Sequence, residues 1–118
     1  MATITAQVLR QQDGNIVVLW ETLTATNNVG SDVHFPDHKL ESIQAIGTFG
    51  GTVTVAGSNA VAAGGTFTTM EDVASVAVST TAAAFFALGA DARWVHPTAG
   101  AGVSDVDVYA LFVPRRGR

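Results

Sequence analysis

Residues 47–59 read GTFGGTVTVAGSN, and this stretch decides between two classes of fold. A dinucleotide-binding loop needs Gly-x-Gly-x-x-Gly between a strand and a helix, and a P-loop needs Lys-Ser/Thr after its last glycine. Here Gly47, Gly50 and Gly51 have a different spacing, and the Thr-Val alternation after them is that of a strand. Without a helix N-terminus there is no dipole to hold an anion. The stretch therefore predicts a tight turn or bulge at the corner of a β-sheet, where glycine permits positive φ.

The rest of the chain also has the pattern of short strands. Apolar and polar residues alternate in residues 3–8, 52–55, 74–78 and 106–112, and residues 16–20 form a continuous apolar run. Residues 82–88 fit either a helical turn or a strand. Pro36 restricts residues 32–37 to a sheet edge or a connection, and Pro97 is expected to end the strand that begins at Arg93.

These patterns predict about eight short strands, separated by turn signals such as Asp13-Gly14-Asn15. No helical periodicity lasts long enough for a βαβ unit. We therefore expect an all-β fold, an antiparallel β-sandwich that is jelly-roll-like or barrel-like. Residues 15–114 would form this domain, preceded by an N-terminal arm or edge strand (1–14) and followed by a basic C-terminal tail (115–118).

The charge content of the chain is low for its size. Only 14% of its 118 residues are charged, compared with about 25% in a typical soluble domain, whereas 47% are hydrophobic. We infer that another subunit or a partner covers part of the surface. The net charge of −4 argues against a nucleic-acid partner. Arg115, Arg116 and Arg118 form a local exception, which is either a solvated terminus or an arm that docks on an acidic neighbour.

The sequence also bears on the compartment of the protein. It contains no cysteine, which excludes a disulfide framework and a thiolate metal site. The N-terminus lacks the pattern of a secretory signal. The longest apolar run, residues 82–88, is far shorter than the about 20 residues of a membrane-spanning helix. We expect a soluble protein that is intracellular when made, with no membrane partner.

Candidate catalytic and metal-binding residues are few. His34 and His38 lie on either side of Pro36, so no helix connects them, and on a strand their Cβ atoms would be about 13 Å apart. Asp105 and Asp107 share one face of a strand, which we interpret as a solvated face that protects an edge strand from foreign pairing. His96 is interpreted as a packed or interface histidine. We therefore expect no enzyme, no cofactor and no metal.

From Ser42 onward, the order of motifs resembles a family of small tailed-bacteriophage structural proteins encoded among the virion genes. In these proteins a GTFGG-strand-GSN segment is followed by an aromatic residue, Arg-Pro, a glycine-rich loop, a strand and a terminal Arg-Arg. The matching segments here are residues 42–44, 47–59, 66–69, 92–97 and Arg115-Arg116. Two departures are residues 60–65, AVAAGG, where the family often has Asp-Gly and Trp, and His96-Pro97 in place of Arg-Pro.

The resemblance implies a capsid decoration, or cement, protein. Such a protein binds the assembled capsid from outside, commonly as a homotrimer, and clamps neighbouring hexamers of the major capsid protein; it is made in the host cytoplasm and resides in the virion. For this chain we expect the binding residues in the N-terminal arm or the C-terminal tail. The candidates are Ile4, Val8, Arg10, Arg115, Arg116 and Arg118.

Two other functions remain open at this point. One is a head–tail connector or tail component, assembled as a ring. The other is a host-facing module that binds carbohydrate or another surface, although its loops contain Gly, Ala, Asn and Ser with few aromatic residues.

Overall fold

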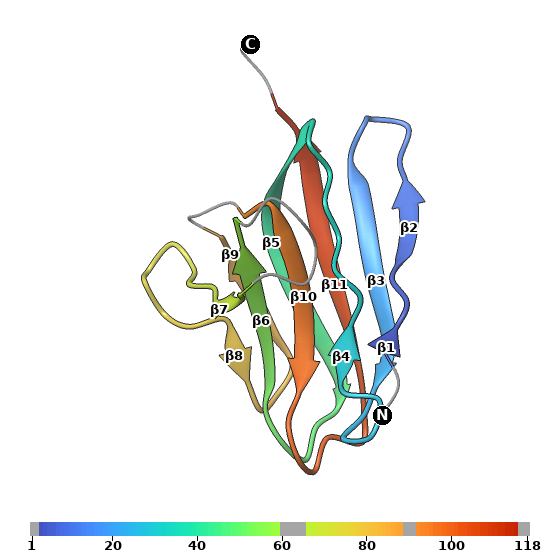
Figure 1. The fold of residues 1–118 in the computed structure, drawn as a ribbon, viewed down its shortest axis with the longest axis vertical. Coiled ribbons are helices and arrows are strands. Elements are labelled where there is room, and N and C mark those ends of the chain that lie inside the picture. Colours follow the sequence, from blue (N-terminus) through green and yellow to red (C-terminus); the bar gives the residue numbers. More distant parts are fainter. Residues whose placement is uncertain (1–2, 60–65, 89–91, 116–118) are drawn as a thin grey trace.

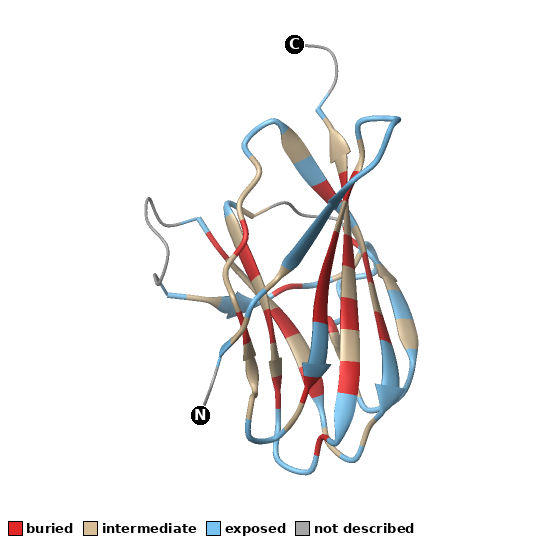
Figure 2. Ribbon diagram, turned by 90° about the vertical axis from the view of Figure 1, so that its right-hand side faces the viewer, coloured by how far each residue is buried: buried red, intermediate tan, exposed pale blue. Residues whose placement is uncertain are grey.

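The computed structural model describes residues 3–59, 66–88 and 92–115, which contain eleven strands and no helix. The strands form two sheets that pack face to face (Figures 1 and 2). Buried side chains line the space between the sheets. The predicted all-β sandwich is confirmed. The number of strands exceeds the expected eight because four of the strands are only two residues long.

Each sheet has five strands in its main order, and one further strand joins the first sheet. The first sheet has the order β1 (Thr3–Ile4), β4 (Val29–Gly30), β10 (Trp94–Ala99), β6 (Val53–Ser58) and β7 (Thr68–Thr69), and β8 (Ser79–Thr80) also pairs with β6. The second sheet has the order β2 (Gln7–Arg10), β3 (Ile16–Leu23), β11 (Asp105–Pro114), β5 (His38–Thr48) and β9 (Ala84–Ala87). Every pair of these strands is antiparallel except β1 and β4.

The glycine cluster forms a corner between the sheets, as predicted. Residues 49–52 connect β5 of the second sheet to β6 of the first, and residues 100–104 return from β10 to β11. The two connections lie against each other, with Gly100 N–H donating to Thr52 O at 2.7 Å. A Cβ on Gly50 would overlap the Gly102 carbonyl oxygen, and one on Gly51 would overlap that of Ala101. Only glycine allows the two backbones to approach so closely.

Trp20 occupies the centre of the core with 0% of its surface exposed. Its indole Nε1–H donates to the backbone oxygen of Ser31 at 2.9 Å, so its polar atom is paired although it is buried. Gly30 lacks a side chain where the Trp20 ring and Pro97 meet, and a Cβ there would lie 2.6 Å from Pro97 Cδ. The indole ring therefore packs directly against the backbone of β4.

The alternating segment of residues 3–8 is divided between the two sheets. Its first part, β1, pairs with β4 in the first sheet, and β2 then pairs with β3 in the second. Ser31 stabilises the crossing point, because its N–H donates to Ile4 O at 2.8 Å and its Oγ accepts from Ala6 N–H at 2.9 Å. The N-terminal segment thereby ties the two sheets together.

The expectation that Pro97 ends a strand is wrong, since Pro97 lies within β10. The N–H groups of Val95 and Ala99 donate to Val33 and Asn28, on the side of β10 that faces β4. Alternation along the strand places the nitrogen of Pro97 on this same side, where β4 pairs with β10 only at Thr98. A missing donor therefore breaks no ladder bond, and the other side of β10 pairs with β6 throughout.

The strand expected at residues 74–78 is also absent from the described structure, in which these residues form a loop. The Asp72 carboxylate accepts the N–H groups of Ala74 at 2.8 Å and Val76 at 3.0 Å, so a side chain replaces a partner strand. Of the alternating valines, Val76 is exposed, whereas Val78 is buried in the core. In residues 82–88, by contrast, the strand alternative is the correct one and forms β9.

We expect Gly51→Ala to lower the free energy of unfolding by roughly 1–3 kcal/mol or more, because its methyl group would displace the Ala101 carbonyl from the corner. Urea denaturation measures this change. Gly100→Ala is the matched control: its Cβ would lie 3.2 Å from Thr52 O, so a smaller loss is expected. Equal midpoints for Gly51→Ala and the wild type would contradict the role of the corner.

Candidate functional site

The two histidines on either side of Pro36 have separate structural partners. The His34 ring lies 5.1 Å from the Trp94 ring, and His38 Nε2 lies 2.8 Å from the backbone oxygen of Gly14. In the part of the chain that the structure describes, no group of three or more His, Asp or Glu side chains could hold a metal ion.

Asp105 and Asp107 lie on β11, which is the central strand of the second sheet. The interpretation that they protect an edge strand is therefore wrong, because β3 and β5 occupy both sides of β11. Asp107 instead accepts the Thr22 N–H at 2.9 Å. Thr22 has a φ of 64°, at an irregularity in the β3–β11 register. Asp107 thus stabilises a bulge in β3.

His96 is packed on the outer side of the first sheet. Its Nδ1 lies 2.7 Å from Asp32 Oδ1, and its ring stacks on Phe67 with centroids 4.1 Å apart. Because a carboxylate only accepts, Nδ1–H is the donor of this hydrogen bond. The His96 ring is thus used both in stacking and in hydrogen bonding, which is the arrangement of a structural histidine.

The candidate binding residues are spread over the molecule. Ile4 packs against the core, whereas Val8 is 43% exposed on β2 at the edge of the second sheet. The Arg10 guanidinium lies 5.9 Å from the centroid of the Phe35 ring, and Arg115 N–H donates to Asp37 O at 3.0 Å. The structure therefore brings Arg10 and Arg115 to one end. Arg116 and Arg118 lie outside the described residues.

A further candidate site is the outer face of the second sheet, which was not recognised from the sequence. On β11, Tyr109 and Leu111 alternate with the buried Val108, Ala110 and Phe112, so they point away from the core. The register places their neighbours on β2, β3 and β9 on this same face. Its large apolar residues are Leu9, Val17, Leu19, Ile46, Phe85, Tyr109, Leu111 and Val113.

This outer face is apolar and, at its centre, uncharged. Phe85 is 69% exposed, and beside it a hollow of about 230 Å³ extends over Val17, Tyr109 and Leu111. Ser42 and Gln44 of β5 are the polar residues that line the hollow. The charged residues of these strands lie toward the strand ends: Arg10, Glu21, Lys39, Glu41, Asp105 and Asp107. A contiguous apolar face of this kind indicates an interaction surface.

One signal in the sequence does indicate this face. Residues 108–113 read VYALFV, which is apolar at every position rather than at every second one. Such a run is typical of a strand covered on both sides. The alternation of Val106, Val108, Ala110 and Phe112 alone predicts the strand but not its covered outer face.

The described residues contain no helix that is long and apolar enough to cross a membrane. In comparisons with known proteins, no family model matches the chain and no curated protein is significantly similar to it.

Proposed function

We propose that this chain is a non-enzymatic structural protein of a bacteriophage virion, which binds the assembled capsid and cements contacts between major capsid proteins as a homotrimer. The observation that carries the proposal is the apolar outer face of the second sheet, which carries no charge at its centre. The resemblance of roughly residues 15–116 to small virion proteins supports the assignment to a capsid.

The size of the outer face suits self-association. The five strands contain 4, 8, 10, 11 and 4 residues, and at about 3.3 Å per residue and 4.8 Å per strand they span roughly 600 Å². A stable interface buries about 800 Å² on each partner. In the proposed trimer, three such faces converge around a three-fold axis and cover Phe85, Tyr109 and Leu111 of each subunit.

Cementing then follows from mass action. A protein that binds only the assembled lattice stabilises each site by RT ln(1 + [L]/Kd), and the many equivalent sites of a capsid add their contributions. This mechanism needs no catalytic group, only an interface that exists in the assembled shell and not in the free capsid protein.

We expect the wild-type protein to have a solution mass of three chains, measured by light scattering on a size-exclusion column. Leu111→Lys should reduce the mass to one chain, because it places a charge at the centre of each converging face. Thr98→Lys is the matched control, since Thr98 lies on β10 in the other sheet, and should leave the trimer intact. A monomeric wild type would contradict the proposal, and a ring of six or more would favour a connector.

We also expect the wild-type protein to co-sediment with expanded capsids and to raise the temperature at which they break open. Deletion of residues 1–10 is a poor test, since it removes both β1 and β2. Val8→Glu changes an exposed side chain of the N-terminal segment without removing a strand, and should weaken co-sedimentation. If neither the wild type nor the variant sediments with capsids, the cementing role is wrong.

A further inference from the structure

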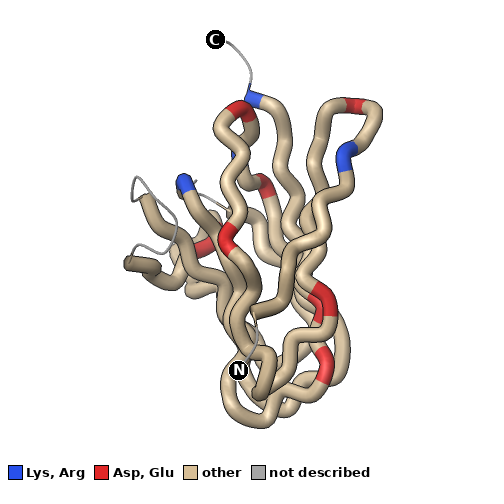
Figure 3. Tube along the Cα trace, turned by 45° about the vertical axis from the view of Figure 1, so that its right-hand side comes forward, with Lys and Arg blue, Asp and Glu red and all other residues tan. Residues whose placement is uncertain are grey.

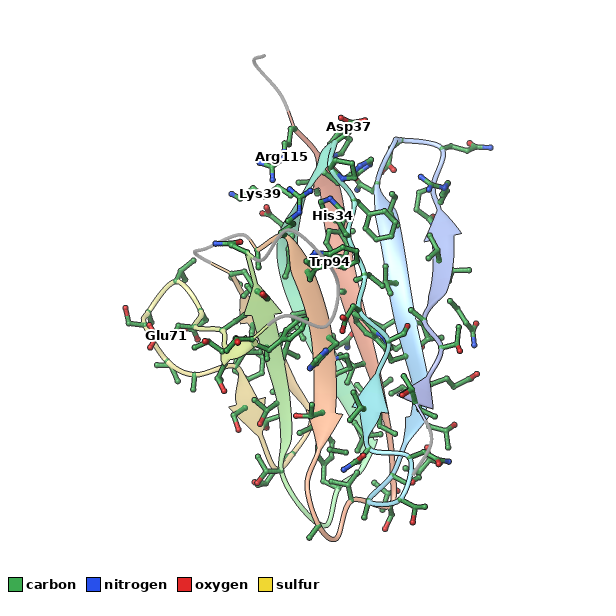
Figure 4. All side chains as sticks on the ribbon, in the orientation of Figure 1. His34, Asp37, Lys39, Glu71, Trp94 and Arg115 are labelled. Atoms are coloured by element: carbon green, nitrogen blue, oxygen red, sulfur yellow. The ribbon has the colours of Figure 1, made fainter. Side chains whose placement is uncertain are left out.

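The basic side chains of the described structure gather at one end of the molecule. The chain has six Lys and Arg residues, of which Arg10, Lys39, Arg93 and Arg115 are described. They come from different elements, yet every blue segment in Figure 3 lies in the half from which the C-terminus emerges. The opposite end, where β3 finishes and β11 starts, carries Glu21 and Asp105. Asp37 is labelled at this same end in Figure 4, and Asp13 precedes Gly14, which contacts His38, so the end combines the described cations with carboxylates.

A cavity of about 340 Å³ opens at this end. Its polar lining consists of His34, His38, Asn59, Arg93 and Arg115, and the rest is apolar. His34 and Arg115 are labelled in Figure 4, at the end where the C-terminus leaves the fold. Among the described residues no Asp or Glu lines the cavity. The lining therefore offers hydrogen-bond donors of positive or neutral charge to a ligand.

Several contacts fix the walls of this cavity. Asn59 Oδ1 accepts the backbone N–H of Arg93 at 3.0 Å, which joins the end of β6 to the start of β10. His38 is held by Gly14 O, and Phe35 packs edge-on against Phe112 with ring centroids 5.0 Å apart. The cavity is built from three connections and the last strand, so its shape depends on the complete fold.

The residues that line the cavity favour a ligand that carries an anionic group next to an apolar group. A guanidinium presents a planar fork of N–H donors that matches a carboxylate, and Phe35 and Phe112 provide an apolar wall beside it. Asp37 follows Pro36 at the cavity, and Asp13 precedes the glycine that contacts His38. These two carboxylates would disfavour a ligand with a high density of negative charge, such as nucleic acid, more strongly than a peptide segment with a few separated carboxylates. The Phe35 ring is already packed against Phe112 and lies near Arg10, so it is not a free platform for a base.

We propose that this cavity, with Arg10 and Lys39 beside it, binds a carboxylate side chain in an acidic segment of a partner protein. The proposed function identifies that partner as the major capsid protein, and the inference rests on it for this identity alone. The site is separate from the outer face of the second sheet, so one surface joins copies of this chain and the other attaches them to the partner.

The test is a titration of the isotope-labelled protein with acetyl-Glu-Leu-Glu-Glu-Leu-amide, followed by NMR at low salt. We expect saturable shifts at the backbone amides of His34, Asn59 and Arg93. The same peptide with Gln in place of each Glu should give none. Arg93→Ala should weaken binding roughly tenfold, because it removes a charge-assisted, bidentate contact. Arg93→Lys, which retains the charge but not the fork, should weaken it less.

Thr26→Asp is the matched control for net charge. It makes the chain more negative by one unit, as Arg93→Ala does, but changes an exposed residue in the loop after β3 at the opposite end. It should bind the acidic peptide like the wild type. Arg93 is itself exposed, so its variants are expected to fold, and their urea midpoints verify this. Equal shifts from the Gln peptide, or equal affinity for Arg93→Ala and wild type, would overturn the proposal.

Two further outcomes distinguish a carboxylate-binding cavity from a nucleic-acid site and from the cementing role. Tighter binding of a twelve-nucleotide single strand than of the acidic peptide would overturn the choice of a protein ligand. The peptide assay uses no capsids, so it tests the cavity independently of the cementing role. Capsid binding without peptide binding would refute the cavity proposal alone, and peptide binding without capsid binding would refute the cementing role alone.

Discussion

The fold depends on a close contact between two backbones at the corner where the chain changes sheets. Gly50 and Gly51 lie in the connection from β5 to β6, and Gly102 lies in the connection from β10 to β11. At each of these positions a side chain would collide with the backbone of the other connection. These two crossings set the separation and the relative position of the sheets. The core around Trp20 fills the space between the sheets. The outer face of the second sheet and the cavity at its end are both positioned by this packing.

Much of this arrangement could be predicted from the sequence, because turn chemistry and period-two alternation act over short distances. The corner at residues 47–51 and the turn at residues 13–15 were identified on these grounds, and the structure confirms them. Pro97 could not be placed correctly, because its tolerance depends on how far β4 extends along β10. The loop at residues 74–78 has the pattern of a strand, but Asp72 takes the hydrogen bonds that a partner strand would have made.

The candidate surfaces were harder to predict, because they arise from residues that are distant in the sequence. Arg93 and Arg115 line one cavity, and Arg10 lies near its Phe35 wall, only after β2, β10 and β11 have been placed. The low charge of the composition did indicate a covered surface, but not its location. In the structure, the centre of the outer face of the second sheet carries no charge. The described cations are concentrated at one end of the molecule.

The division of the N-terminal segment between the sheets has a mechanical consequence. Thr3 begins β1 at one end of the sandwich, and Pro114 finishes β11 at the other (Figure 1). A force that pulls these two points apart therefore acts along the strands, so it shears the β1–β4 and β11 ladders instead of unzipping them from one side. Under such a load the many residue pairs of the β11 ladders share the tension, whereas the β1–β4 ladder has only two pairs to share it. The N-terminal end of the domain is therefore expected to yield before β11 does.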